Sequence, residues 1–411
     1  MDGWRALSLC YLCFTLLPGG SAERKLRCVT LIFRHGDRSA NEPFPTDPHQ
    51  EAAWPQGLGQ LSELGMRQQY ELGQYLRKRY KGFLNATYDR NEVYVRSTDI
   101  DRTLMSAQAN LAGLYPPSGE QIWNPNITWQ PIPVHTVPLA EEQLLEFPYY
   151  CPRYKALTKE TLSSSQFLDL IKPYEDFIKS MSTNTGYSVD SLVNGGKLWM
   201  VYDALLCEGI HNMTLPAWAT TEVRTKLLEL SQILLMALFD ILKQVEKSRL
   251  QGGVLVDAVL KNFTHFIKTP TKRKMIIYSA HDTTLAALQI ALNVFNGQLP
   301  PYAACQFFEL HQEDNGQYSI DMYYRNGTGA EPHPIYLPDC GKPCLLQRFA
   351  ALVSPIIAED RRKECGLTDA KNDKGTVTGL VVVVIVMLLL NIVLLSLLCC
   401  RKAPRNSYQD I

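Results

Sequence analysis

Residues 28–39 have the sequence CVTLIFRHGDRS, in which a continuous apolar run ends abruptly in charge. An apolar, partly β-branched run of this length is typical of a strand buried on both faces of an α/β sheet. The charged end then falls in a loop at the carboxyl edge of the sheet, where open α/β sheets bind ligands. Two arginines and a histidine within five residues repel one another, so this loop is suited to hold an anion such as phosphate. An ordinary charged surface turn is the alternative for these residues alone.

Two later segments repeat this order of short strand, charged loop and helix. In the first segment, the predicted strand 92–95 is followed by Arg96 and Arg102 and by the predicted helix 104–114. In the second, the predicted strand 275–278 is followed by His281 and Asp282 and by the predicted helix 285–292. If the three strands are parallel, their loops emerge at one edge of the sheet and share a pocket. The helix N-termini there also favour a bound phosphate.

Together the three loops contain the parts that phosphoryl transfer without a metal requires. These parts are a nucleophile, positive groups for the phosphate oxygens, and a proton donor for the leaving group. A zinc site at Cys340-x3-Cys344 is disfavoured because no second cysteine or histidine pair stands at zinc-ligand spacing.

The rest of the chain predicts one α/β unit with a helical insertion. Residues 62–80 predict a crossover helix, and residues 306–310 and 318–324 predict an antiparallel pair. Helical periodicity dominates residues 151–268, where Trp199 and Tyr202 are expected in the core rather than stacked on a substrate. No repeat or low-complexity tract is present.

Both ends of the chain are hydrophobic and indicate a type I membrane protein. Residues 1–22 are typical of a cleaved signal peptide, and residues 377–398 are long and apolar enough to predict a transmembrane helix. Arg401, Lys402 and Arg405 follow that helix, so the positive-inside rule places the tail in the cytosol. The tail ends in Tyr408-Gln409-Asp410-Ile411, which resembles a tyrosine-based sorting signal read by endocytic adaptors, with an inert spacer as the alternative.

The composition is consistent with a secreted or luminal domain. The predicted luminal part carries five glycosylation sequons, at Asn85, Asn126, Asn212, Asn262 and Asn326, and seven cysteines. Six cysteines in an oxidising compartment allow three disulfides in 15 pairings, and the strand context of Cys28 indicates a buried free thiol. The chain has 41 basic and 41 acidic residues, so no bulk charge indicates a nucleic-acid partner.

The motif Arg34-His35-Gly36-Asp37-Arg38 with the later His281-Asp282 resembles the histidine acid phosphatases, a branch of the phosphoglycerate-mutase-like group. Residues 54–57, 96–99, 131–136 and 278–284 extend the resemblance to the vertebrate prostatic and lysosomal members, across essentially the whole luminal chain. One departure is Ala40, where the family commonly has proline.

The resemblance implies an α/β fold, a three-layer sandwich with a mixed, mostly parallel sheet plus a smaller mainly helical domain. The expected organisation is a signal peptide at 1–22, an α/β catalytic domain at 23–150 and 269–366, a helical cap at 151–268, a stalk at 367–376, a transmembrane helix at 377–398 and a cytoplasmic tail at 399–411.

The resemblance also implies the chemistry. His35 would attack phosphorus to form a phosphohistidine, and Asp282 would protonate the leaving oxygen. Arg34, Arg38, Arg102 and His281 would bind the phosphate, with Arg96 in a supporting structural position. The implied disulfides are Cys151–Cys365, Cys207–Cys305 and Cys340–Cys344, leaving Cys28 free.

The charges of the site predict an acidic optimum. Neighbouring arginines disfavour the charged form of His35, which keeps this nucleophile neutral in acid. The same arginines lower the pKa of Asp282, so its protonated form becomes available mainly at low pH.

We therefore expect an acid phosphomonoesterase that needs no cofactor. The alternatives are a catalytically silent membrane receptor or adhesion ectodomain and a phosphomutase. Expected partners are small phosphate monoesters or phosphopeptides, a membrane, an endocytic adaptor and a second copy in a homodimer, but no nucleic acid. The expected location is the plasma membrane, endosome or lysosome.

Overall fold

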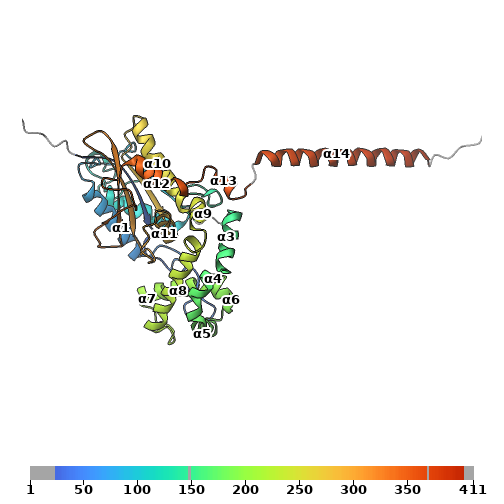
Figure 1. Cartoon of the computed structure of the whole chain (residues 1–411), viewed down its shortest axis with the longest axis horizontal. Helices are drawn as coiled ribbons and strands as arrows, with labels where there is room; N and C mark the ends of the chain where they lie inside the picture. The colour runs from blue at the N-terminus through green and yellow to red at the C-terminus, as the bar shows by residue number, and fades with distance from the viewer. Residues whose placement is uncertain (1–23, 147–149, 368–369, 402–411) are drawn as a thin grey trace, which may run out of the picture.

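The computed structural model describes residues 24–146, 150–367 and 370–401, without the side chains of 370–380 and 398–401. The predicted signal peptide, and the predicted sorting residues Tyr408 and Ile411, lie outside the described residues. Figure 1 shows a folded body from which the last helix extends away.

A six-stranded sheet forms the centre of the folded body, with the strand order β2-β3-β1-β4-β5-β6. The strands are β1 (Lys25–Arg34), β2 (Val93–Ser97), β3 (Met275–Ala280), β4 (Cys305–Gln312), β5 (Tyr318–Arg325) and β6 (His333–Ile335). The strand β1 is buried from Cys28 to its end, as its apolar run predicts.

The sheet is mixed, as predicted, but its parallel part is smaller than the mostly parallel sheet we expected. The strand β3 pairs in parallel with β1 and β2, so the carboxyl ends of these three strands lie at one edge. The pairs β1–β4, β4–β5 and β5–β6 are antiparallel. The predicted pair of late strands therefore continues the sheet beyond β1.

Helices cover both faces of the sheet. The α-helices are α1 (Glu63–Arg79), α2 (Asp101–Leu114), α3 (Pro152–Leu162), α4 (Ser165–Ile171), α5 (Glu175–Thr185), α6 (Val189–Val193), α7 (Lys197–Ile210), α8 (Thr221–Phe239), α9 (Gln244–Leu250), α10 (Gly252–Lys268), α11 (Asp282–Ala291), α12 (Leu346–Val353), α13 (Arg361–Glu364) and α14 (Ala370–Arg401). Single 3₁₀ turns are η1 (Glu51–Ala53), η2 (Gly119–Gln121), η3 (Leu139–Glu141), η4 (Lys172–Tyr174) and η5 (Ser354–Ile356).

The layer on one face of the sheet consists of α1 and α2. Ser62 begins α1 as predicted, because its side chain accepts a hydrogen bond from the Gly65 amide. Leu72 and Leu76 of α1 pack with Val29 and Leu31 of β1 in one apolar cluster. The loop after β1 also touches α1 directly, since a Cβ on Gly36 would lie 2.3 Å from the Gly65 carbonyl oxygen. Glycine at position 36 thus lets the loop lie against the helix.

The opposite face is covered by α10, α11 and α12. Val256 and Phe263 of α10, Leu285 of α11 and Phe349 of α12 belong to the cluster that contains Ile32 of β1. The helix α10 therefore packs on the sheet, although it lies within the helical stretch predicted from residue 151 onwards.

The helices α4 to α8 form a second apolar cluster away from the sheet, below the α/β part in Figure 1. The loop that follows β1 enters this cluster, because Ala40, Phe44 and Trp54 are buried among its members. Ala40 is only 1% exposed, so the residue that departs from the family pattern lies inside the contact between the loop and the helices.

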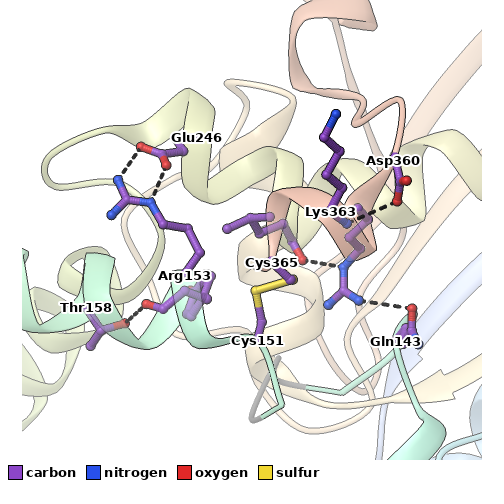
Figure 2. Close-up of a disulfide and its surroundings, with 11 residues drawn as sticks. Gln143, Cys151, Arg153, Thr158, Glu246, Asp360, Lys363 and Cys365 are labelled. Atoms are coloured by element: carbon purple, nitrogen blue, oxygen red, sulfur yellow. Dashed lines mark hydrogen bonds and ion pairs between the residues drawn. A yellow bond between two sulfur atoms is a disulfide. The ribbon is translucent and has the colours of Figure 1, made fainter. Parts of the chain in front are cut away.

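Two of the three implied disulfides are present. Cys151 at the start of α3 bonds to Cys365 after α13, 214 residues later, as Figure 2 shows. Arg361 reinforces this junction by donating to the Leu250 carbonyl and to Gln143. Cys340 bonds to Cys344.

The implied bond between Cys207 and Cys305 is wrong in this structure, where both are buried free thiols, as is Cys28. The two cysteines belong to different apolar clusters, Cys207 with the helices and Cys305 with the α1–α2 layer. The Cys207 sulfur instead lies 3.5 Å from the Tyr302 hydroxyl.

Among the residues that the structure describes, no helix has both the length and the hydropathy needed to cross a membrane. The membrane span at residues 377–398 stays a prediction.

Candidate active site

The three charged loops meet at the edge of the sheet where β1, β2 and β3 end. A cavity of about 420 Å³ opens there. Five of the predicted residues line it, namely His35, Arg38, Arg102, His281 and Asp282. Residues up to 247 positions apart in the sequence are thus brought to one site by the parallel pairing of β1 with β3 and of β3 with β2.

His35 is held in the state that a nucleophile requires. Its Nδ1 lies 2.8 Å from the Gly36 carbonyl oxygen, which can only accept, so Nδ1 carries the proton and Nε2 keeps its lone pair. Burial lowers the pKa of His35 well below its usual value, and the charges of Arg102, Arg34 and Arg38 lower it further. The imidazole therefore stays neutral in acid.

Arg38 is fixed by a carboxylate from the helical part. Its two terminal nitrogens donate to the two carboxylate oxygens of Asp203 on α7, each at 2.9 Å. Both side chains are at most 5% exposed. Burial opposes the charge of Arg38, but Asp203 raises the pKa of Arg38 well above its usual value. The Arg38 guanidinium is therefore a permanent positive charge at the cavity.

Unlike Arg38, Arg102 has few contacts that fix its guanidinium. One contact is a 3.5 Å hydrogen bond to the Gly59 carbonyl, and its buried Nε has no partner within the described protein. Burial, followed by the charge of Arg38, lowers the pKa of Arg102 to about 10. Because an anion between the two arginines would relieve this repulsion, the pair is suited to phosphate.

His281 is the cap residue directly before α11, and it contacts two oxygen atoms. Its Nε2 lies 3.0 Å from the Thr98 hydroxyl oxygen and 2.8 Å from Oε2 of Glu146. The His281 ring also meets the His35 ring edge to face, with centroids 5.7 Å apart. The second predicted histidine is therefore next to the first.

Asp282 is the first residue of α11 and its carboxylate is bound on both sides. One oxygen accepts from the Thr283 amide at 2.7 Å, and the other pairs with Arg34 at 2.8 Å. Burial raises the pKa of Asp282, but Arg34, Arg38 and His281 outweigh it, and the net shift is downward. The carboxyl group is therefore ionised except in acid.

Arg34 lies beside the cavity but does not line it. Its guanidinium donates to the Pro300 carbonyl at 2.6 Å, pairs with Asp282 and stacks on the Tyr302 ring. It lines a neighbouring cavity of about 450 Å³, which shares Asp282 and Trp199 with the first. Its charge still acts on His35, whose pKa it lowers.

Arg96 is not among the described residues that line the cavity. Its terminal nitrogen binds both oxygens of Glu142 at 2.8 Å. Glu142 in turn accepts from the backbone amides of Leu144 and Leu145. Arg96 thus stabilises the turn that leads to Glu146.

Two acidic residues at the site were not predicted, Asp203 and Glu146. A sequence signal existed for Asp203, because it is a charged residue inside the strongly apolar helix α7, and buried charges are normally paired. Glu146 lies in a turn without periodicity or motif, so nothing in the sequence distinguished it.

Away from the charged groups the cavity wall is mostly apolar. Its members include Leu162, Val193, Trp199, Met200, Leu234 and Leu238, which come from α3, α6, α7 and α8. Trp199 therefore belongs both to the apolar core of the helices, as expected, and to the wall of the cavity.

Comparisons with known proteins agree with this geometry. Residues 25–325 match the family model described as histidine phosphatase superfamily (branch 2). The chain is 54% identical to prostatic acid phosphatase of Bos taurus over 362 residues, which cover 88% of this chain and 92% of that protein. It is 49% identical to lysosomal acid phosphatase of Xenopus laevis over 405 residues, which cover 98% and 93%.

Solved structures with the same fold include two bacterial phytases. The apo form of Hafnia alvei phytase has a TM-score of 0.60 at 17% identity and covers 84% of this chain and 98% of its own. The phytase of Citrobacter braakii has a TM-score of 0.61 at 19% identity and covers 84% and 100%.

Proposed function

The chain belongs to the histidine phosphatase superfamily, branch 2, and is an acid phosphatase, and we propose that it hydrolyses phosphate monoesters through a phosphohistidine at His35. The observation that carries the proposal is the state of His35. Its neutral, buried imidazole has a proton-free Nε2 and lines a cavity that is also lined by Arg38, Arg102 and Asp282.

In the first step, the lone pair of His35 Nε2 attacks phosphorus while the bond to the leaving oxygen breaks. Protonated Asp282 donates its proton to that oxygen, and the alcohol departs. Arg38 and Arg102 neutralise the phosphate oxygens, which carry the charge during transfer. The Gly36 carbonyl keeps Nδ1 protonated and so stabilises the phosphohistidine.

In the second step, water attacks phosphorus and gives a proton to the Asp282 carboxylate. The bond between phosphorus and Nε2 breaks, inorganic phosphate leaves, and both His35 and Asp282 return to their starting states. Arg34 has two functions in this scheme: it contributes to phosphate binding, as the resemblance implies, and its ion pair sets the proton affinity of Asp282.

The decisive experiment is hydrolysis of p-nitrophenyl phosphate at about pH 5 by the protein and by its His35→Ala variant. His333→Ala is the matched control, because that histidine is exposed on the edge strand β6. We expect His35→Ala alone to lose activity by at least about four orders of magnitude. An active His35→Ala variant would contradict the nucleophile, and an inactive parent would favour the silent ectodomain.

The apolar wall favours substrates with an aryl or alkyl leaving group, including phosphotyrosine in peptides. Leu234, Leu238 and Trp199 offer such groups a contact surface, whereas the charged side chains of the cavity are suited to the phosphate. We regard a phosphomutase as less fitting, because the described residues of the apolar wall include no second cluster of arginines for another phosphate.

We propose the domain organisation predicted from the sequence, with an α/β part at 23–150 and 269–366 and a helical part at 151–268. In this proposal α10 joins the two parts, since it lies in the helical stretch and packs on the sheet. The helical part completes the site through Asp203 and the apolar wall.

The proposed location is luminal or extracellular, anchored by residues 377–398, as in a type I protein of the plasma membrane, endosome or lysosome. The apolar run and the basic residues after it support the anchor, and the names of the lysosomal relatives support the compartment. A homodimer and an adaptor that binds Tyr408 and Ile411 belong to the same proposal.

A further inference from the structure

Glu146 is a charged residue of the cavity that the proposed reaction does not use. Of the described residues lining the cavity, it alone carries a charge outside the set His35, Arg38, Arg102, His281 and Asp282. Its side chain is 11% exposed, and Oε2 lies 2.8 Å from Nε2 of His281. A carboxylate therefore lies at the border between the phosphate-binding base and the apolar wall.

The backbone around Glu146 is held by the side chains of Gln251, Thr284 and Glu142. The Gln251 side chain donates to the Glu146 carbonyl at 2.9 Å, and the Thr284 hydroxyl of α11 donates to the Leu145 carbonyl. Glu142, bound to Arg96, accepts from the amides of Leu144 and Leu145. These hydrogen bonds fix the backbone that carries the Glu146 carboxylate.

The field of Glu146 reaches the phosphate-binding groups. Among the acidic residues that stabilise the charge of Arg102, Glu146 has the largest effect. Because Oε2 of Glu146 lies 2.8 Å from Nε2 of His281, a phosphate bound by Arg102 and His281 would lie close to this carboxylate. Glu146 lines the same cavity, so the leaving group would share that cavity with it.

We propose that Glu146 is a specificity-determining residue that selects leaving groups without negative charge and disfavours those that carry a carboxylate or a second phosphate. This inference rests on the proposed function, because it concerns the leaving group of that reaction. A neutral apolar leaving group contacts only the apolar wall. A leaving group that carries a second negative charge is repelled by the Glu146 carboxylate, at a place where little water screens the two charges. A positively charged group gains from the same carboxylate.

The size of the effect follows from Coulomb's law. Two charges about 7 Å apart at an effective dielectric constant of 20 to 40 change a rate or a binding constant by roughly ten-fold or more. We therefore expect about ten-fold discrimination for each unit of charge on the leaving group.

Three substrates of similar shape test the proposal: phenyl phosphate, 4-carboxyphenyl phosphate and 4-(aminomethyl)phenyl phosphate. The readout is the ratio of kcat/KM for the carboxy and aminomethyl compounds, compared between the protein and its Glu146→Gln and Glu146→Lys variants. The two compounds differ by two units of charge, so we expect Glu146→Gln to raise this ratio about a hundred-fold and Glu146→Lys to raise it further. Comparing ratios between variants removes the intrinsic reactivity of each ester.

Glu141→Gln and Glu141→Lys are matched controls, because Glu141 is exposed in η3 five residues earlier. These variants should leave the ratio unchanged. A ratio within two-fold of the parent in both Glu146 variants, with phenyl phosphate still hydrolysed, would overturn the proposal. Failure of the parent to hydrolyse phenyl phosphate would instead overturn the proposed function.

A binding measurement on the parent protein covers the case in which the Glu146 variants do not fold. Calorimetric titration compares phenylphosphonate with 4-carboxyphenylphosphonate, which resist hydrolysis. We expect the carboxy compound to bind about ten-fold more weakly. Equal or tighter binding of the carboxy compound would overturn the charge selectivity of Glu146.

Discussion

Asp203 holds Arg38 through two parallel hydrogen bonds of 2.9 Å, one to each carboxylate oxygen. The two residues are 165 positions apart, one in the loop after β1 and the other on α7. Because both are buried, neither charge could remain there without the other. This pair joins the helical part to the phosphate-binding loop.

We expect Asp203→Asn to impair both stability and phosphate binding. The change leaves the buried Arg38 charge without its anion, at a cost of about 3 kcal/mol in the free energy of unfolding. The freed guanidinium would also lose its orientation, so KM and the inhibition constant of inorganic phosphate should rise at least about ten-fold. Urea unfolding and steady-state kinetics measure the two effects.

Asp176→Asn is the control for this change, since Asp176 is 98% exposed and pairs only with neighbouring Lys179 among the described residues. It should alter neither quantity. Unchanged phosphate inhibition in a folded Asp203→Asn protein would show that Arg38 needs no orientation by Asp203.

Arg34 lowers the pKa of both the proton donor and the nucleophile, so its removal should move the pH profile upward. Activity requires protonated Asp282, which is lost as pH rises through its pKa, and neutral His35, which is lost as pH falls through its pKa. Arg34→Gln raises both pKa values. Both limbs of the profile with an alkyl phosphate should therefore shift to higher pH, by about one unit.

Arg67→Gln is a suitable control, because Arg67 is 70% exposed and, in the described part of the chain, forms an ion pair only with Glu63. Its profile should match the parent. A profile of Arg34→Gln that stays in place, or shifts to lower pH, would contradict the electrostatic role of Arg34 toward Asp282.

Much of the site was predictable because each catalytic candidate follows a strand directly. The apolar runs before Arg34, Arg96 and His281 predict strands, and parallel pairing at once brings the three loops together. Local sequence therefore contained both the position and the chemistry of the proposed reacting groups.

Residues that complete the site through long-range contacts were not predictable in this way. Asp203 reaches Arg38 from a helix and Glu146 reaches His281 from a turn, and both partners are fixed only by tertiary packing. The implied bond between Cys207 and Cys305 failed for a related reason: it came from resemblance, whereas the packing places the two thiols in different clusters.

The cysteine assignment can be checked by alkylation of the unfolded protein without a reducing agent, followed by peptide mass spectrometry. We expect label on Cys28, Cys207 and Cys305, and none on Cys151 or Cys365 until a reductant is added. Burial raises the pKa of Cys207 to about 12, so the native protein should resist the reagent. If the Cys207 and Cys305 peptides were instead recovered as one disulfide-linked species, the Cys207–Cys305 bond implied by the resemblance would be correct.

The five sequons should differ in occupancy because their asparagines differ in exposure. Asn85, Asn126, Asn212 and Asn326 are exposed, whereas Asn262 on α10 is partly buried. The Asn262 amide nitrogen, to which a glycan would be attached, donates to the Tyr278 hydroxyl at 3.2 Å. Since α10 packs on the sheet at this point, a glycan there would have to displace Tyr278 from the apolar cluster that it shares with Val259 and Phe263. Enzymatic deglycosylation in heavy-oxygen water labels each asparagine that carried a glycan, so it should label the four exposed sites. Full occupancy of Asn262 would mean that glycosylation of this residue precedes the packing of α10.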